Sequence, residues 1–312
     1  MGSRLTAALC QRNVVEEFPK IDHLVGSDLR KGRTDVEGKG VAKYTFMEGD
    51  ISDPDFMQEL FKSRVDGIFH LAASLTLDAE LDFNRGMNTN VHALIRLLEL
   101  CRAQAIPPKF LFSSSISSYG GKLPRVVDDF VFQTPQTSYG THKAVAELLI
   151  NDYSRRGFID GRILRFPVVL THPGPPTASV SDRIASLIRE PLRGHEAICQ
   201  LKPDTPIAVA SVDKIVESMI RLYMVPAQAF GATRAINQPA LTVTPAGITQ
   251  AVQRHLKPGQ AGRVRWAHNS QMQAIVDGWP ATFTSALAIE LGLTADVSID
   301  ALIESFQKHQ HA

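Results

Sequence analysis

Cysteine is scarce in this sequence, with 3 residues among 312, namely Cys10, Cys101 and Cys199. Their odd number and wide spacing exclude a disulfide framework, and neither a CxxC pair nor the spacing of a metal site is present. Long hydrophobic runs are missing as well, so the chain has no candidate membrane span, and its first residues lack the apolar core of a signal peptide. We therefore expect a cytoplasmic, globular protein with reduced, packed cysteines and no metal site.

An excess of either charge is also missing. The 33 Lys and Arg residues nearly balance the 32 Asp and Glu residues, which leaves a formal net charge of +1. This balance gives no reason to expect nucleic acid or an acidic membrane surface as a partner, so the expected partner is a small molecule. With 44% hydrophobic and 21% charged residues, the chain is long enough for a large core and a second, smaller lobe.

The stretch Tyr139-Gly-Thr-His-Lys143 places a phenol and an ammonium one helical turn apart. Residues four apart lie on the same face of an α-helix, and the apolar pattern that follows is strongly helical. Lowering the pKa of a tyrosine from about 10 to about 7 requires roughly 4 kcal/mol of preferential stabilisation of the phenolate, and a nearby ammonium is a reasonable source. Taken alone, such a pair also occurs by chance on amphipathic helices.

A second polar cluster lies upstream, in Ser113-Ser-Ser-Ile-Ser-Ser-Tyr-Gly120. The apolar run Phe110–Phe112 before it predicts a buried parallel strand that ends in the serines. Ligands bind beyond the carboxyl ends of such strands, so the Ser115 hydroxyl would be placed to hold a substrate oxygen whose proton Tyr139 moves. The alternative is that the serines only form a turn at the strand end.

Together these two segments resemble the catalytic segment of the extended short-chain dehydrogenase/reductase family, which includes the NAD-dependent epimerases and dehydratases. The resemblance covers nearly the whole chain. It implies an α/β fold with a doubly wound Rossmann-type parallel sheet and a small C-terminal substrate lobe. The expected NAD-binding domain comprises residues 1–170 together with 206–243, and residues 171–205 and 244–312 form mainly the substrate lobe.

The first residues depart from the family pattern. The family opens with a buried strand and a G-x-x-G-x-x-G loop, of which this sequence has only a match to the third glycine, at Gly2. The usual first strand lies in the middle of the sheet, and its loss removes several buried side chains worth about 1.5–3 kcal/mol each. We expect the chain as written to fold poorly or to bind NAD weakly. One explanation of the missing strand is that translation, or the gene model, starts at an internal methionine.

The predicted cofactor site extends over several strand ends. Asp28 follows an apolar segment, where an acidic residue accepts hydrogen bonds from the adenosine ribose and repels a 2′-phosphate, so it favours NAD over NADP. His70 is interpreted as a packed core residue and not as an acid, base or metal ligand. The resemblance implies further cofactor contacts, beside Tyr139 and Lys143 themselves, from Asp50, Ile51, Leu71, Ala72, Ala73, Ser74, Asn90, Pro167 and Val168.

Segments 134–157 and 189–194 most resemble the members of the family that oxidise D-erythronate with NAD. The resemblance implies that Tyr139 takes the hydroxyl proton of a small sugar acid while a hydride moves to NAD. Lys143 would lower the Tyr139 pKa and hold the nicotinamide ribose, and Ser115 would orient the alcohol. The candidate substrate-binding residues in the predicted lobe are Ser179, Arg189 and Arg193. They could bind a small hydroxy acid, since the guanidinium group of an arginine matches a carboxylate bidentately.

Two other functions stay open. A nucleotide-sugar 4-epimerase or dehydratase would use the same three catalytic residues, but those enzymes usually carry an asparagine where this sequence has Val168. A cofactor-deficient pseudoenzyme or an interaction module is favoured by the missing first strand and opposed by the intact triad. The family also implies a homodimer through the helices that carry Asn90 and Tyr139.

Overall fold

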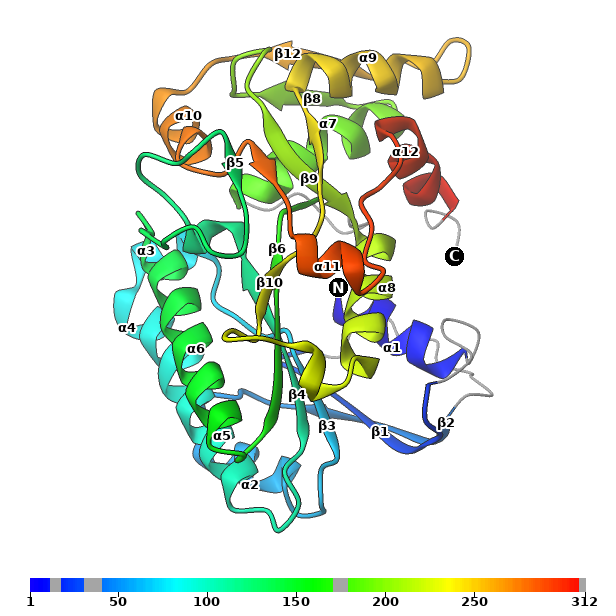
Figure 1. The fold of residues 1–312 in the computed structure, drawn as a ribbon. Helices are drawn as coiled ribbons and strands as arrows, with labels where there is room; N and C mark the ends of the chain where they lie inside the picture. Colours follow the sequence, from blue (N-terminus) through cyan, green and yellow to red (C-terminus); the bar gives the residue numbers. More distant parts are fainter. Residues whose placement is uncertain (12–17, 31–40, 171–178, 309–312) are drawn as a thin grey trace.

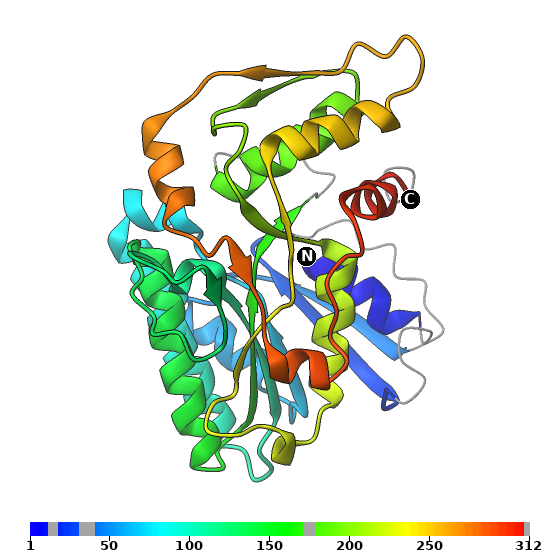
Figure 2. The ribbon, with the colours of Figure 1, turned by 45° about the horizontal axis from the view of Figure 1, so that its top comes forward.

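The computed structural model of the chain describes residues 1–11, 18–30, 41–170 and 179–308. A parallel sheet with helices on both faces occupies one part of the molecule, and a smaller lobe of short strands and helices occupies the other (Figure 1). In both views the lobe lies beyond the carboxyl ends of the central strands (Figure 2). No helix of the described ranges is both long and apolar enough to cross a membrane.

Four parallel strands form the central sheet, in the order β10-β6-β4-β3. Their bounds are β3 (Gly67–His70), β4 (Lys109–Ser115), β6 (Asp160–Phe166) and β10 (Ala235–Asn237). The strand predicted from Phe110–Phe112 is confirmed as β4, the inner strand between β3 and β6. Its apolar run is buried because helices cover both faces of a parallel sheet.

Two further strands, β1 (Ile21–Asp28) and β2 (Val41–Glu48), pair in parallel as a separate sheet. Within the part of the chain that the structure describes, β1 has no second partner strand and β3 pairs only with β4. An open edge leaves side chains less covered, and Val25 of β1 is 41% exposed whereas Phe110 of β4 is 0% exposed. The predicted doubly wound α/β class is confirmed, with the sheet divided between β1 and β3.

The alternation of side chains along β4 explains the two helical layers. Phe110 and Phe112 point to one core, which they share with helices α2 (Pro54–Leu60), α5 (Ala93–Arg102) and α6 (Ser138–Arg155). Leu111 points to the other core, which it shares with α1 (Gly2–Cys10) and α8 (Val212–Met224). The three cysteines are free and buried, which confirms their predicted packing role.

Pro167 marks the transition from the central sheet to the lobe. Strand β6 ends just before it, and β7 (Val168–Leu170) begins just after it and pairs with β9 (Ile207–Ser211) instead. A proline has no N–H to continue a ladder, so a change of partner strand is favoured there. A third strand, β11 (Leu241–Val243), completes this sheet in antiparallel pairing.

The rest of the lobe surrounds a third apolar core. It comprises the strands β8 (Glu196–Cys199) and β12 (Arg263–Trp266) and the helices α7 (Val180–Leu192), α9 (Pro245–His255), α10 (Ser270–Asp277) and α12 (Ile299–Lys308). The strands β5 (Val126–Val127) and β13 (Thr282–Phe283) pair beside a smaller cluster, and helix α11 (Ala286–Glu290) packs on the core of α1 and α8. Residues 171–178, the first part of the predicted substrate segment, lie outside the described residues. The predicted domain boundaries stay predictions.

Candidate active site

The predicted site residues lie at the carboxyl ends of the parallel strands. Ser115 ends β4 beside Phe166 of β6, and Asp28 ends β1 beside Glu48 of β2. Residues 71–74 follow the end of β3 directly. Since this edge is where open α/β sheets bind ligands, the structure brings the predicted cofactor and catalytic positions to one side of the fold.

Helix α6 presents Tyr139 and Lys143 to the end of β4. The helix begins at Ser138, and the side chain of its N-cap residue Thr137 accepts a hydrogen bond from Gly140 N at 3.1 Å. The Lys143 ammonium lies 5.5 Å from the centroid of the Tyr139 ring and 4.4 Å from that of Phe112. The two side chains therefore share one side of α6, as their spacing predicts.

Gly140 permits the close approach of α6 to the segment after β4. A Cβ atom at this position would lie 2.0 Å from the carbonyl oxygen of Ser117, a distance that a side chain cannot occupy. The hydroxyl of Ser115, two residues earlier, accepts a hydrogen bond from Ser117 N at 3.1 Å. The glycine thus lets the serine turn and the tyrosine helix pack against each other.

The Tyr139 phenol is neutral in the polypeptide alone. Burial raises its pKa to about 12, and a hydrogen bond with the Ser115 side chain offsets part of the rise. This direction is opposite to the lowering by Lys143 that the sequence predicted. The physical reason is that burial disfavours the phenolate, while the Lys143 ammonium donates to the backbone carbonyl of Ser113 at 2.6 Å.

Lys143 itself is 3% exposed. Burial lowers its pKa to about 7, and the negative charge of Glu147 offsets part of that change. Lys143 therefore titrates near neutral pH while Tyr139 stays protonated. Burial favours the neutral form of each group, so it raises the pKa of Tyr139 and lowers the pKa of Lys143.

Asn90 fixes the chain after β3. It lies in a π-helical turn, η1 (Asn88–His92), a distortion that often occurs at functional sites. Its side chain accepts from Ser74 N at 2.8 Å and donates to Ser74 O at 2.9 Å, so it holds the backbone of that residue on both sides. The predicted contact of Asn90 with the cofactor stays a prediction.

Two buried hydroxyl groups test whether this edge fits a dinucleotide. Ser74 Oγ and Ser27 Oγ are buried and have no hydrogen-bond partner among the described residues. Ser27 precedes the terminal residue of β1, and Ser74 follows β3. A buried polar group without a partner is costly, so hydroxyl and phosphate groups of a dinucleotide would satisfy both. At these two positions the residues present fit a dinucleotide.

The adenine side of the predicted cofactor site is formed by Asp28, Asp50 and Ile51. Both carboxylates are exposed, and Asp50 Oδ1 accepts from the backbone and the hydroxyl of Ser52 at 2.8 Å each. Gly2, in contrast, begins helix α1, and within the described ranges, its chain neighbours aside, no atom from outside its own helix lies within 4 Å of its Cβ position. Its predicted contact with the cofactor stays a prediction.

On the nicotinamide side, Leu71 and Ala73 are partly buried, Ala72 is exposed, and Pro167 is buried. Val168 is 2% exposed and pairs with Val209 in the lobe sheet. These positions surround the ends of β3 and β6, next to the β4 end that carries Ser115.

The predicted substrate-binding residues are placed differently from one another. Ser179 is the N-cap of α7, where its hydroxyl accepts from Asp182 N at 3.2 Å. Arg189 is 0% exposed, and its guanidinium bonds Asp182 at 2.6 Å and Glu190 at 2.7 Å. A buried guanidinium that bonds two carboxylates does not fit the predicted substrate role. Arg193 is exposed at the end of α7 and stays a prediction.

His70 is a core residue, as the sequence predicted. Its ring stacks on Phe112 with centroids 5.7 Å apart, and burial lowers its pKa to about 3. It is therefore neutral at physiological pH and unsuited to proton transfer there. Within the described ranges, no group of three or more His, Cys, Asp or Glu residues could hold a metal ion.

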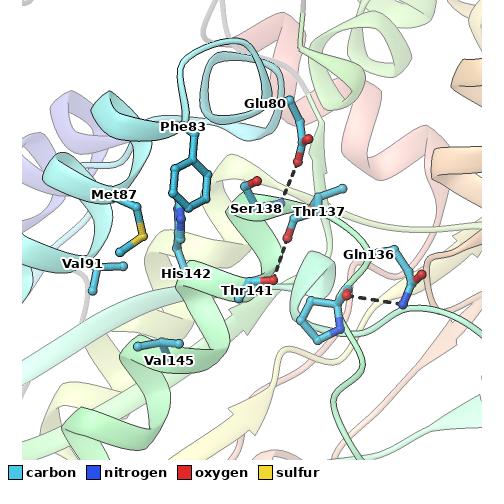
Figure 3. Close-up of a pocket in the computed structure, with 11 residues that line it drawn as sticks. Glu80, Phe83, Met87, Val91, Gln136, Thr137, Ser138, Thr141, His142 and Val145 are labelled. Atoms are coloured by element: carbon cyan, nitrogen blue, oxygen red, sulfur yellow. Dashed lines mark hydrogen bonds between the residues drawn. The ribbon is translucent and has the colours of Figure 1, made fainter.

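A cavity of about 540 Å³ lies beside α6, whose Ser138, Thr141, His142 and Val145 line it (Figure 3). Phe83 lies over His142 on one side, and Glu80 accepts a hydrogen bond from Ser138 N at 2.6 Å on the other. The wall comes from α6, from the segment before it, from η1, and from helices α3 (Thr76–Leu81) and α4 (Phe83–Met87). Tyr139 and Lys143 do not line this cavity.

Sequence reasoning missed a buried ion pair next to the site, between Glu147 of α6 and Arg165 of β6. Two signals were available. Glu147 follows Lys143 by one helical turn, and Arg165 interrupts an otherwise apolar run in a strand expected to be buried.

Comparison with known proteins agrees with this geometry. Residues 1–207 match the model of the NAD dependent epimerase/dehydratase family. The chain is 39% identical to D-erythronate dehydrogenase of Cupriavidus necator, over 87% of this chain and 84% of that protein. It is 32% identical to D-erythronate dehydrogenase of Haemophilus influenzae, over 98% of this chain and 95% of that one.

A solved structure described as the nucleoside-diphosphate-sugar epimerase from Agrobacterium tumefaciens superposes with a TM-score of 0.88. The two chains are 30% identical, and the match covers 99% of this chain and 93% of the other.

Proposed function

Since the chain belongs to the NAD-dependent epimerase/dehydratase family, whose members use a nicotinamide cofactor, we propose that it oxidises a secondary hydroxyl group of a small sugar acid such as D-erythronate, with NAD as the cofactor. The product is the keto acid. The observation that supports this most directly is the meeting of Ser115, Tyr139 and Lys143 at the carboxyl end of β4.

In this proposal Tyr139 removes the proton of the substrate hydroxyl, and Ser115 donates a hydrogen bond to the same oxygen. The bound cofactor supplies a hydride acceptor and, in its oxidised form, a positive charge. Lys143 has N–H donors besides the one on Ser113, and these suit a ribose hydroxyl. Asn90 keeps the strand end at Ser74 in place.

The raised Tyr139 pKa sets how much stabilisation the site must supply. A pKa of about 12 must fall by about five units for half ionisation near pH 7, which requires about 7 kcal/mol. The Lys143 ammonium, 5.5 Å from the ring centroid, contributes about 3 kcal/mol at an effective dielectric constant of about 20. The hydrogen bond with Ser115 is already included in the pKa of about 12, so the remaining stabilisation, about 4 kcal/mol, is assigned to the positive cofactor ring.

The choice of NAD rests on Asp28. Its carboxylate is exposed at the end of β1, where a ribose hydroxyl can donate to it and a 2′-phosphate is repelled. Titration of the purified chain with NAD and with NADP tests this part of the proposal, with tighter binding of NAD expected. If neither dinucleotide binds, the result would favour a cofactor-deficient pseudoenzyme and would agree with the weak NAD binding expected from the missing first strand.

The substrate is tested by following NADH formation with D-erythronate and other four-carbon to six-carbon aldonates, beside UDP-sugars and dTDP-sugars. Net NADH from an aldonate is expected, and Tyr139→Phe should abolish it without weakening NAD binding. Epimerisation of a nucleotide sugar without net NADH would instead support the second candidate, which the Agrobacterium tumefaciens structure favours. Against it, Val168 offers a buried methyl surface where an asparagine would contact the diphosphate.

We also propose a homodimer. The outer surface of α3–α6 exposes apolar side chains, among them Leu81 (79%), Phe83 (57%) and Leu148 (70%). Neighbouring exposed apolar residues of this kind mark interfaces, and a second copy that packs helix against helix would cover them. Light scattering is expected to give a dimer that Leu148→Glu dissociates, whereas Val297→Glu, at a side chain 88% exposed elsewhere, leaves it intact. A monomeric wild type would contradict the proposal.

A further inference from the structure

A buried ion pair lies one helical turn beyond Lys143. Glu147 is 2% exposed and Arg165 is 5% exposed. The guanidinium Nε lies 3.0 Å from each carboxylate oxygen of Glu147, and Nη2 donates to Oε2 at 2.7 Å. Ser114 donates a short hydrogen bond to Oε1, and Gln133 donates to Oε2 at 3.1 Å.

The cluster continues toward the C-terminal part of the chain. Arg165 Nη1 donates to the Tyr119 hydroxyl at 2.6 Å, and that hydroxyl lies 3.1 Å from Asn237 Oδ1. Asn237 N donates to Asp129 at 2.6 Å, and the Ser285 hydroxyl donates to the same carboxylate at 2.6 Å. Arg165 is therefore fixed on two sides, by the carboxylate of α6 and by Tyr119.

Stability alone is a weak reason for such a cluster. Removing two charges from water costs several kcal/mol per ion, and well-packed apolar residues of similar volume often replace a buried ion pair without loss of stability. The place of the pair is more informative. Glu147 and Lys143 are four residues apart on α6, both are buried, and this spacing directs their side chains to the same face.

We propose that Glu147, held by Arg165, is a positioning residue that keeps the Lys143 side chain charged and in place at the end of β4. The role rests on the proposed function, in which Lys143 supports proton removal by Tyr139. Arg165 holds the Glu147 carboxylate through Nε and Nη2, and its Nη1 donates to the Tyr119 hydroxyl and to the backbone carbonyl of Asp129. Because Lys143 and Glu147 are both buried, the charge of the carboxylate acts on the ammonium more strongly than it would in water.

The other ionisable groups around Lys143 do not replace Glu147. From α6 itself come Tyr139, neutral at physiological pH, and His142, which is disfavoured as a cation by burial. From β3 comes His70, which is neutral as well. Glu147 is the group that raises the pKa of Lys143 against the effect of burial.

Lysine side-chain carbon NMR of the purified chain without added nucleotide tests this directly, with the Lys143 signal identified by its loss in Lys143→Met. We expect Glu147→Gln to lower the midpoint of the Lys143 titration by about one pH unit, and Glu147→Asp to restore most of it. The double variant Glu147→Met/Arg165→Met replaces the pair by apolar side chains and should also lower the midpoint, even if Glu147→Gln fails to fold.

Asp160→Asn is the matched control, because Asp160 and Arg162 form an ion pair of 2.6 Å at the other end of β6, with Arg162 0% exposed. It should lower the melting temperature without moving the Lys143 midpoint. An unchanged midpoint in folded Glu147→Gln or in the double variant overturns the inference.

The pH dependence of kcat/KM separates this inference from the proposed function. In Glu147→Gln, the fall in activity at alkaline pH should begin about one pH unit lower than in the wild type. If the wild type oxidises no sugar acid but the NMR midpoint moves as expected, the proposed function fails and the support of Lys143 stands. If the wild type oxidises a sugar acid but the midpoint does not move, the proposed function stands and the support of Lys143 by Glu147 fails.

Discussion

Replacing Lys143 by methionine removes the ammonium from beside the Tyr139 ring while keeping an apolar chain of similar length. The ammonium lies 5.5 Å from the ring centroid, and at an effective dielectric constant of about 20 this corresponds to about 3 kcal/mol for a phenolate. The Tyr139 pKa should therefore rise by about two units in the working enzyme, and kcat at neutral pH should fall roughly 150-fold.

The assay is NADH formation from D-erythronate across a pH series at saturating NAD, because Lys143 is also expected to contact the cofactor. Raising the pH by about two units should restore most of the activity of Lys143→Met, since more of the phenol is then ionised. Lys143→Arg keeps the charge and should lose less, and Tyr139→Phe should stay inactive at every pH. The reasoning is refuted if Lys143→Met shows the pH profile of the wild type and differs only in its KM for NAD.

Three further predictions concern the site and the core. Gly140→Ala places a Cβ atom 2.0 Å from Ser117 O, so α6 must shift; we expect a loss of about 1–3 kcal/mol in thermal unfolding and a lower kcat, and a wild-type kcat would contradict this. Asp28→Ala should reduce the preference for NAD over NADP in kcat/KM, and an unchanged ratio would exclude this carboxylate as the selector. The pKa of His70 is about 3 when folded, well below its ordinary value of 6.5, so the unfolded chain binds more protons between these values. This contribution to the free energy of unfolding is complete above about pH 6.5 and is lost on acidification, by about 1.4 kcal/mol per pH unit. His70→Phe should flatten this part of the pH dependence when the free energy of unfolding is measured with urea at a series of pH values.

The sequence alone determined the elements that carry the site. The apolar run Phe110–Phe112 predicted β4, and the spacing of Tyr139 and Lys143 predicted that both side chains lie on one face of a helix; the structure agrees with both. These features depend on local periodicity and on the short reach of one helical turn, so neighbouring residues suffice to specify them. The interpretation of His70 as a packed residue succeeded for the same reason, because its neighbours in the strand are apolar.

Tertiary structure decided the properties that depend on residues far apart in the chain. Arg189 is buried against the carboxylates of Asp182 and Glu190, and the Tyr139 pKa is raised and not lowered. Both follow from burial, which is the sum of many long-range contacts. Glu147 and Arg165 meet only because α6 packs on β6, so the sequence offers a signal for each residue but only the folded chain shows that they form a buried ion pair.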